Sequence, residues 1–202
     1  MGAPVRTVIE GRRFLHKELW RVVKRQLEHG KSVPAGGFYD DLVSMVFALH
    51  AFEAYLNYVG EHLAPDIWQD ERNYFRKEPF RGFDGKVRKV LELAQIAEPT
   101  RDLRPYSSVW LLKSLRDQIS HAKPEDFAHA IEHDSDTVLP FHHTPLDEIV
   151  TRANAEQAHI DIETFAQVIH TAAKTNVDDI WFGLVPFGGP LQYSGGSTTL
   201  AT

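Results

Sequence analysis

The stretch FYDDLVSMVFALHAFEAYLNYVGEHL, residues 38–63, decides the fold, because it has the periodicity of one long helix. Asp40 and Asp41 stand in its first turn, where carboxylates favour the helix dipole, and Ala64-Pro65 ends it. One stripe of the predicted helix is apolar and must face a core: Leu42, Val46, Leu49, Leu56 and Leu63. The rest of the chain has to supply the elements that cover this stripe.

Further helical patterns lie on both sides of this segment. We predict a first helix over residues 6–29, where Leu15, Leu19 and Leu27 belong to one apolar face and Gly30 supplies a stop. The remaining predicted helices span residues 66–78, 86–97, 107–123 and 162–174, the last of them capped by Asp161. Short loops between helices favour antiparallel neighbours. The sequence therefore predicts an all-α, antiparallel up-and-down helical bundle.

The pattern weakens after Pro124. Residues 125–133 fit a short helix, residues 134–143 fit a β-ribbon or an irregular excursion, and Thr144-Pro145 is a good helix start. Residues 186–202 are rich in Gly, Ser, Thr and Pro and predict a flexible tail. We therefore expect a bundle core over residues 1–123, a less regular extension over 124–185 whose final helix packs on the core, and a tail over 186–202.

Composition narrows the class of protein. The chain has 202 residues, is 43% hydrophobic and 25% charged, and has no cysteine. Disulfides and cysteine nucleophiles are therefore excluded. No apolar run approaches the roughly 18 residues of a membrane helix, and residues 1–13 are charged where a signal peptide is apolar, so we expect a cytoplasmic protein with no membrane partner. The net charge of −6 is uneven: residues 1–31 are basic and residues 124–202 are acidic.

Two charged residues interrupt apolar stripes. Glu53 falls within the apolar arc of residues 38–63, flanked by His50 and Asn57, and Arg116 lies between Leu112 and Ile119 on a later stripe. A carboxylate in such a place needs a partner, so we predict that Glu53 and Arg116 meet where the two helices pack. Such a pair either only fixes the helix register or forms the polar wall of a cleft.

The segment LRDQISH, residues 115–121, resembles the signature of the HEPN (higher eukaryotes and prokaryotes nucleotide-binding) superfamily, in which an Arg and a His enclose four residues near the end of a helix. Residues 52–57, FEAYLN, resemble the acidic and polar stretch of an earlier HEPN helix. The resemblance covers about residues 38–123. It departs from the pattern of some HEPN toxins, because Asn57 and Tyr58 stand where those proteins carry basic residues.

The resemblance implies metal-independent RNA cleavage without a cofactor. In that reaction the ribose 2′-hydroxyl attacks the adjacent phosphate and leaves 2′,3′-cyclic phosphate and 5′-hydroxyl ends. Arg116 suits phosphate binding and His121 suits proton transfer, with Asp117 or Glu53 to orient one of them. His50 and Asn57 are expected to line the site. The resemblance also implies a homodimer in which two motifs meet, a role in stress response or defence, and a neutralising protein partner.

Two alternatives remain. The first is a non-catalytic HEPN-like module for interaction or nucleotide binding, in which Glu53 and Arg116 are structural. The second is a metal hydrolase, because four histidines are close in sequence: His129, His133, His142 and His143. A helix would place the first two on one face, as zinc requires, but histidines in a surface loop explain the cluster more simply.

Overall fold

The computed structural model describes residues 5–33, 37–124, 143–177, 182 and 185–200. Helices dominate, which confirms the all-α class. Four long helices form the body of the molecule: α1 (Leu15–Ser32), α2 (Phe38–Leu63), α6 (Tyr106–Ser120) and α8 (Arg152–Ala173). Shorter helices join them: α3 (Pro65–Gln69), α4 (Glu71–Tyr74), α5 (Gly82–Leu93) and α7 (Pro145–Ile149).

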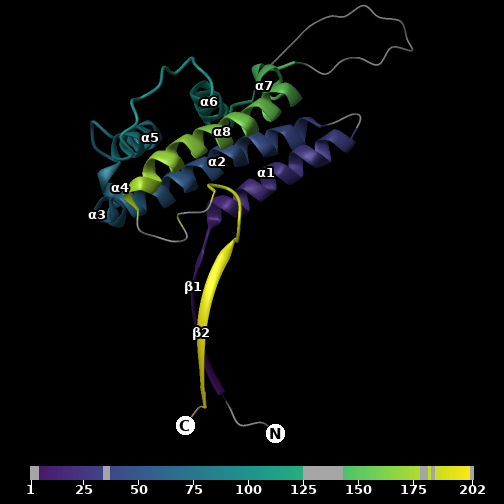
Figure 1. The fold of residues 1–202 in the computed structure, drawn as a ribbon. Helices are drawn as coiled ribbons and strands as arrows, with labels where there is room; N and C mark the ends of the chain where they lie inside the picture. The colour runs from purple at the N-terminus through teal and green to yellow at the C-terminus, as the bar shows by residue number, and fades with distance from the viewer. Residues whose placement is uncertain (1–4, 34–36, 125–142, 178–181, 183–184, 201–202) are drawn as a thin grey trace, which may run out of the picture.

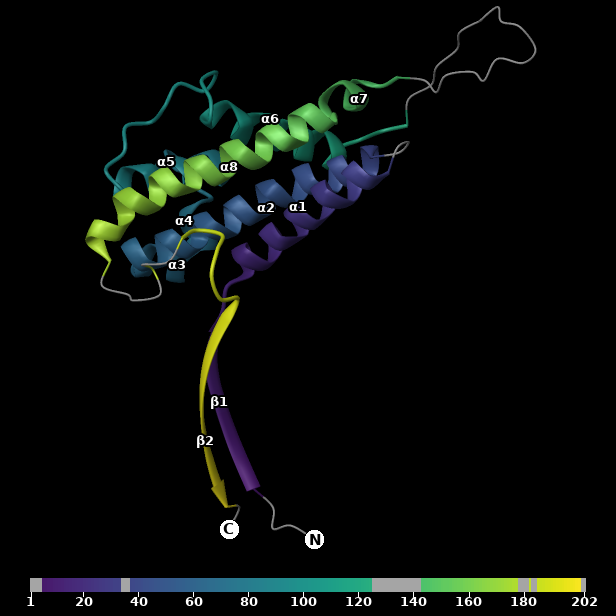
Figure 2. The same cartoon turned by 45° about the vertical axis from the view of Figure 1, so that its right-hand side comes forward.

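The four long helices alternate in direction along the chain (Figures 1 and 2). α1 runs antiparallel to α2, since Phe14 before its start contacts Tyr58 near the end of α2. α6 runs antiparallel to α8, because Tyr106 contacts Phe165 while Ser108, further along α6, bonds to Asp161, which is earlier in α8. α2 and α8 lie side by side in the same direction. The four helices alternate in direction along the chain, but α2 and α8 are parallel neighbours, which differs from the predicted antiparallel arrangement.

α2 is the central helix of the core. Met45, Leu49, Phe52 and Leu56 are fully buried between the helices that surround them, and Trp20 of α1 closes the core on one side. By length and composition α2 is the one described helix that is able to cross a membrane, but 56% of the relevant window is buried in the bundle. The core helix of a soluble protein meets the same criteria, and α2 packs against α1, α5, α6 and α8.

The end of α2 is closed by close packing rather than by a side-chain cap. Pro65 begins α3, as the missing N–H of proline permits at a first helical position. Trp68 then folds back onto Gly60, where a Cβ atom would lie 2.0 Å from the indole ring. The indole N–H donates to Asn57 Oδ1 at 3.3 Å. Gly60 is therefore needed for the close approach of α3 to α2. The single helix predicted over residues 66–78 is instead two short helices.

The first predicted helix is wrong over its beginning. Residues 6–13 do not belong to α1 but form β1 (Val5–Arg13), which pairs antiparallel with β2 (Gln192–Leu200). The sequence favours a strand here, because β-branched Val5, Thr7, Val8 and Ile9 would crowd a helix. The predicted flexible tail is thus ordered as β2, and the two strands form a ribbon that projects from the bundle (Figures 1 and 2).

The last helix is longer than predicted. α8 begins at Arg152, where the Thr151 side chain accepts a bond from the Asn154 N–H. Asp161 is therefore not a cap but a buried residue in the middle of the helix. Its carboxylate accepts hydrogen bonds from Arg104, Ser108 and Gln157, which tie α8 to the start of α6. α8 packs against α2 and α6.

Other predicted boundaries lie close to the observed ones. The helix start at Thr144-Pro145 is confirmed in α7, where Thr144 and Asp147 form a capping box. α5 begins and ends four residues earlier than predicted, because the Gly82 to Gly85 segment is helical rather than a loop. The predicted elements over residues 125–133 and 134–143 fall almost wholly outside the described residues.

Candidate functional site

Three residues predicted for catalysis lie near the end of α6: Arg116 and Asp117 on the helix and His121 directly after it. The helix ends at Ser120, three residues before Lys123-Pro124, and His121 takes a non-helical conformation with its N–H bonded to the Asp117 carbonyl. On a continuous helix Arg116 and His121 would diverge by about 140°. The helical hydrogen-bond pattern reaches the His121 N–H and the helix ends there, with the His121 backbone at φ −118° and ψ 13°. His121 is exposed, and the Arg116 side chain is half-buried.

Asp117 organises the charges at this end of α6. Its Oδ1 lies 2.8 Å from Arg116 Nε, and its Oδ2 accepts a hydrogen bond from Lys113 at 2.9 Å. The hydrogen bond from Lys113, followed by the nearby Arg116 charge, lowers the pKa of Asp117. Asp117 is therefore ionised at neutral pH and holds the guanidinium on its Nε side. Arg116 makes no ion pair with any other described carboxylate.

The predicted contact between Glu53 and Arg116 is wrong. Glu53 Oε1 instead accepts a hydrogen bond from Lys86 Nζ of α5 at 3.2 Å. The reason is that Glu53 and Arg116 lie at different positions along the axes of the packed helices. Phe52 contacts Phe165, and Phe165 contacts Tyr106, so Glu53 lies level with the start of α6. Arg116 is ten residues further along α6, about 15 Å away along the axis.

Lys86 is the polar residue that the sequence analysis missed. It is 5% exposed, and its ammonium donates to Glu71 Oε1 at 2.6 Å as well as to Glu53. Phe75 covers the ammonium at 5.8 Å from its ring centroid. Two carboxylates around one buried ammonium join α2, α4 and α5. The signal was the position of Lys86 beside Val87 and Val90, on the apolar face of its helix.

The two residues expected to line the site lie apart from Arg116. Asn57 accepts the Trp68 indole N–H and belongs to the α2–α3 contact. His50 is exposed on α2 beside Phe47. Arg116 and Asp117 therefore form an ion pair close in sequence to His121, and Glu53 and Asn57 belong to other contacts.

Four buried aromatic and imidazole side chains gather where the ribbon joins the bundle. His16 packs against Tyr58 at 4.8 Å and Tyr55 at 5.7 Å between ring centroids, and the Tyr55 hydroxyl lies 3.1 Å from His170 Nδ1. Burial, followed by the charge of neighbouring Lys17, lowers the pKa of His16 to about 3. This imidazole is neutral at physiological pH and belongs to the core.

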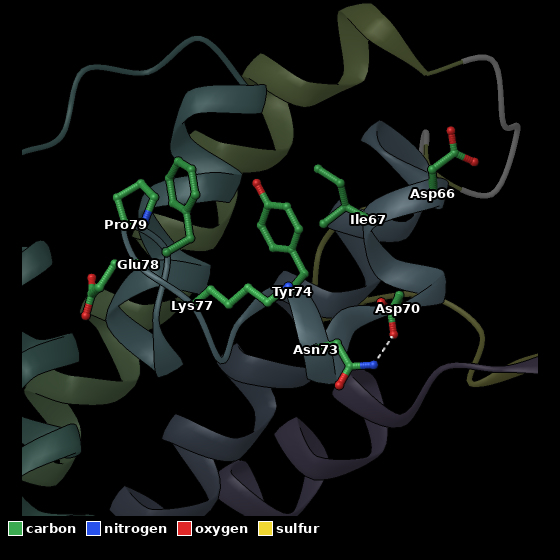
Figure 3. Close-up of a pocket in the computed structure, with 9 residues that line it drawn as sticks. Asp66, Ile67, Asp70, Asn73, Tyr74, Lys77, Glu78 and Pro79 are labelled. Carbon is green, nitrogen blue, oxygen red and sulfur yellow. Dashed lines mark hydrogen bonds between the residues drawn. The ribbon is translucent and has the colours of Figure 1, made fainter.

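A surface cavity of about 520 Å³ lies over α3 and α4 (Figure 3). Tyr74 and Phe80 stack at 6.1 Å in its wall, and Asn73 donates to Asp70 at 2.8 Å. Three carboxylates and one ammonium contribute its charge: Asp66, Asp70, Glu78 and Lys77. A net negative lining disfavours phosphate, so this cavity is a poor RNA site. None of the residues predicted for catalysis lines it.

The metal hypothesis gains no support from the described residues. They contain no group of three or more His, Cys, Asp or Glu side chains placed to hold a metal ion. Of the predicted histidines, His143 is described and exposed. His129, His133 and His142 lie outside the described residues.

Comparisons of the chain with protein-family models, with curated proteins and with solved structures gave no match. The functional argument therefore depends on the residues and their geometry.

Proposed function

We propose that this protein is a HEPN-type, metal-independent endoribonuclease whose catalytic groups are Arg116 and His121. The observation that carries the proposal is the ion pair of a half-buried guanidinium and an ionised carboxylate near the end of α6, with an exposed imidazole directly after the helix. The resemblance of residues 115–121 to the HEPN signature supports the same proposal. A cytoplasmic location belongs to the same proposal.

Arg116 supplies the positive charge that the reaction needs. Asp117 contacts Nε, which leaves the two terminal nitrogens to donate to the non-bridging oxygens of the phosphate. Charge builds up on these oxygens in the transition state, where a fixed guanidinium is most useful. Lysine has the same charge but lacks the planar fork of donors. Arg116→Lys therefore tests whether the reaction needs the two parallel hydrogen bonds or only the positive charge.

His121 transfers the proton. A neutral imidazole accepts the proton of the attacking 2′-hydroxyl, or an imidazolium donates one to the departing 5′-oxygen. One His121 in one chain cannot do both at once. Two copies of the motif, facing each other across a two-fold axis, provide a base and an acid. Ile119, an apolar residue that is 40% exposed on the last turn of α6, favours such a contact.

α2 is enclosed by α1, α5, α6 and α8, so its part in the proposed dimer is to support α6. Glu53 does not orient Arg116 or His121, because it accepts a hydrogen bond from Lys86 instead. Asp117 takes the orienting role alone.

The test is incubation of labelled total RNA with the protein in the presence of a chelator. We expect cleavage to 2′,3′-cyclic phosphate ends, and a loss of rate of about 10²–10⁴-fold in His121→Ala and about 10²–10³-fold in Arg116→Ala. Arg116→Lys should recover little of that loss. His143→Ala is the matched control, because it removes an exposed histidine elsewhere and should keep the wild-type rate.

Thermal melting of each variant separates catalysis from folding. An Arg116→Ala variant that loses cleavage but melts like the wild type supports the proposal. If wild-type protein leaves RNA intact, or if His121→Ala cleaves as fast as wild type, the non-catalytic helical module is the better description.

A further inference from the structure

The β1–β2 ribbon extends away from the helices for most of its length (Figures 1 and 2). Its contacts with the bundle lie at its base, where Arg12 pairs with Glu61 and the Phe14 N–H donates to the Leu191 carbonyl at 2.8 Å. Further out, Val8 is 43% exposed and Ile9 is 71% exposed. Among the described residues each strand pairs only with the other. In the part of the chain that the structure describes, neither strand of the ribbon has a further strand at its outer edge.

Such a ribbon needs a partner for physical reasons. An isolated two-stranded ribbon is marginally stable in water, and three or more strands are usually required. An open edge presents a row of backbone donors and acceptors to any strand that approaches. The exposed Val8 and Ile9 add apolar surface that a partner strand would cover.

We propose that β1 pairs antiparallel with β1 of a second copy of this chain, in the register that places Val8 opposite the partner's Val8. The two ribbons then form one four-stranded sheet. This inference does not rest on the proposed RNA cleavage, because it concerns a different part of the molecule.

The charges of β1 select this register. With Val8 at the two-fold axis, residue 6 lies opposite residue 10 of the second copy, and the sequence has an arginine and a glutamate at those positions. Because of the two-fold symmetry, this pair of opposite charges occurs twice in the dimer. Opposite charges directly across an antiparallel pair stabilise it, and like charges destabilise it.

The neighbouring registers lack this complementarity. Alternation of side chains between the two faces allows the axis to move only to a neighbouring residue of β1. An axis at Ile9 places Arg6 opposite the partner's Arg12, so two like charges meet. An axis at Thr7 gives neither Arg6 nor Glu10 an opposite charge. An axis at Gly11 would place Glu10 opposite the partner's Arg12, but Arg12 already pairs with Glu61 at the base of the ribbon. β2 has no charged residue, so its edge has no comparable preference for one register.

A single-cysteine experiment tests the register directly, because the natural chain has no cysteine. Val8→Cys places two thiols opposite each other, within the reach of a disulfide. Under mild oxidation of the full-length protein, without RNA, we expect a disulfide-linked dimer on a non-reducing gel.

Ile9→Cys is the matched control. Its side chain is more exposed than Val8, so random collision would link it faster. In the proposed register, however, Ile9 faces the partner's Thr7 and lies too far from the partner's Ile9 for a disulfide. Ser194→Cys tests the β2 edge, because a disulfide-linked dimer through this position would mean that β2 and not β1 forms the contact.

Charge reversal tests the proposed attraction between residue 6 of one copy and residue 10 of the other. Glu10→Arg should weaken the ribbon contact roughly tenfold, because two attractive pairs become repulsive. The double variant Arg6→Glu with Glu10→Arg should restore it. Cross-linking that is equal at positions 8 and 9, cross-linking only through position 194, or a double variant as weak as Glu10→Arg would each overturn the proposal. Loss of RNA cleavage alone would not bear on it, since the gel contains no RNA.

Discussion

At the scale of single residues, His16 makes folding sensitive to acid. The unfolded imidazole takes up a proton near pH 6.5, while the buried one stays neutral until about pH 3. Because the folded pKa is the lower one, the unfolded state binds more protons at mildly acidic pH. The stability is fully present above pH 6.5 and falls as the pH decreases toward 3.

We therefore predict that wild-type protein loses about 2 kcal/mol of unfolding free energy through His16 between pH 7 and pH 5. His16→Phe removes the titrating group, keeps a ring beside Tyr58, and should show a smaller loss by about that amount. Urea unfolding at the two pH values measures the difference. Equal pH dependence in both proteins would contradict the prediction, because it would mean that His16 has the same pKa in the folded and unfolded states.

Single residues also mark the limit of the sequence argument. Glu53 and Arg116 were both recognised as charges on apolar stripes, and that part depended only on helical periodicity. Which residue each one contacts depends on how far one helix slides along another. Periodicity around the axis contains no information on that translation, so Lys86 could not be identified as the partner of Glu53.

At the scale of elements, Lys86 holds α5 and α4 against α2. Its ammonium is buried between Glu53 and Glu71, so removing it leaves two carboxylates facing each other beside Phe75. We predict that Lys86→Met costs about 2–4 kcal/mol of unfolding free energy in a chemical denaturation experiment.

Two further variants give this prediction its controls. Lys31→Met removes the ammonium of an exposed pair with Glu28 and should change stability by less than about 1 kcal/mol. In the Lys86→Met background, Glu53→Gln should recover part of the loss because it removes one of the opposed charges. A Lys86→Met protein as stable as wild type would mean that the cluster does not hold these helices.

Element boundaries followed from the sequence where local chemistry defines them. α2 begins and ends where its acidic first turn and Pro65 predicted, and α7 has the predicted cap. β1 and β2 could not be found in the same way, because each strand becomes stable through a partner about 190 residues away in the sequence. The β-branched residues 5–9 were a local signal, but the helical pattern that follows Phe14 concealed it.

At the scale of the whole molecule, the ribbon and the end of α6 offer two separate contacts between copies. Two different two-fold contacts on one chain build assemblies larger than a dimer, closed or open according to how the axes meet. We therefore predict that wild-type protein sediments as a species larger than a dimer at raised concentration. Glu10→Arg should reduce it to the dimer made by α6, and Ile119→Glu should reduce it to the dimer made by the ribbon.

Sedimentation velocity of both variants, combined with the RNA assay, separates the roles of the two contacts. The α6 contact unites the two motifs, so Ile119→Glu should lose cleavage although it still dimerises through Val8. Glu10→Arg should keep cleavage, since the ribbon holds none of the groups that touch phosphate. The variant with both substitutions should be a monomer. If Glu10→Arg alone is monomeric yet active, one chain is sufficient for catalysis, and the two-fold cleft at α6 has to be abandoned.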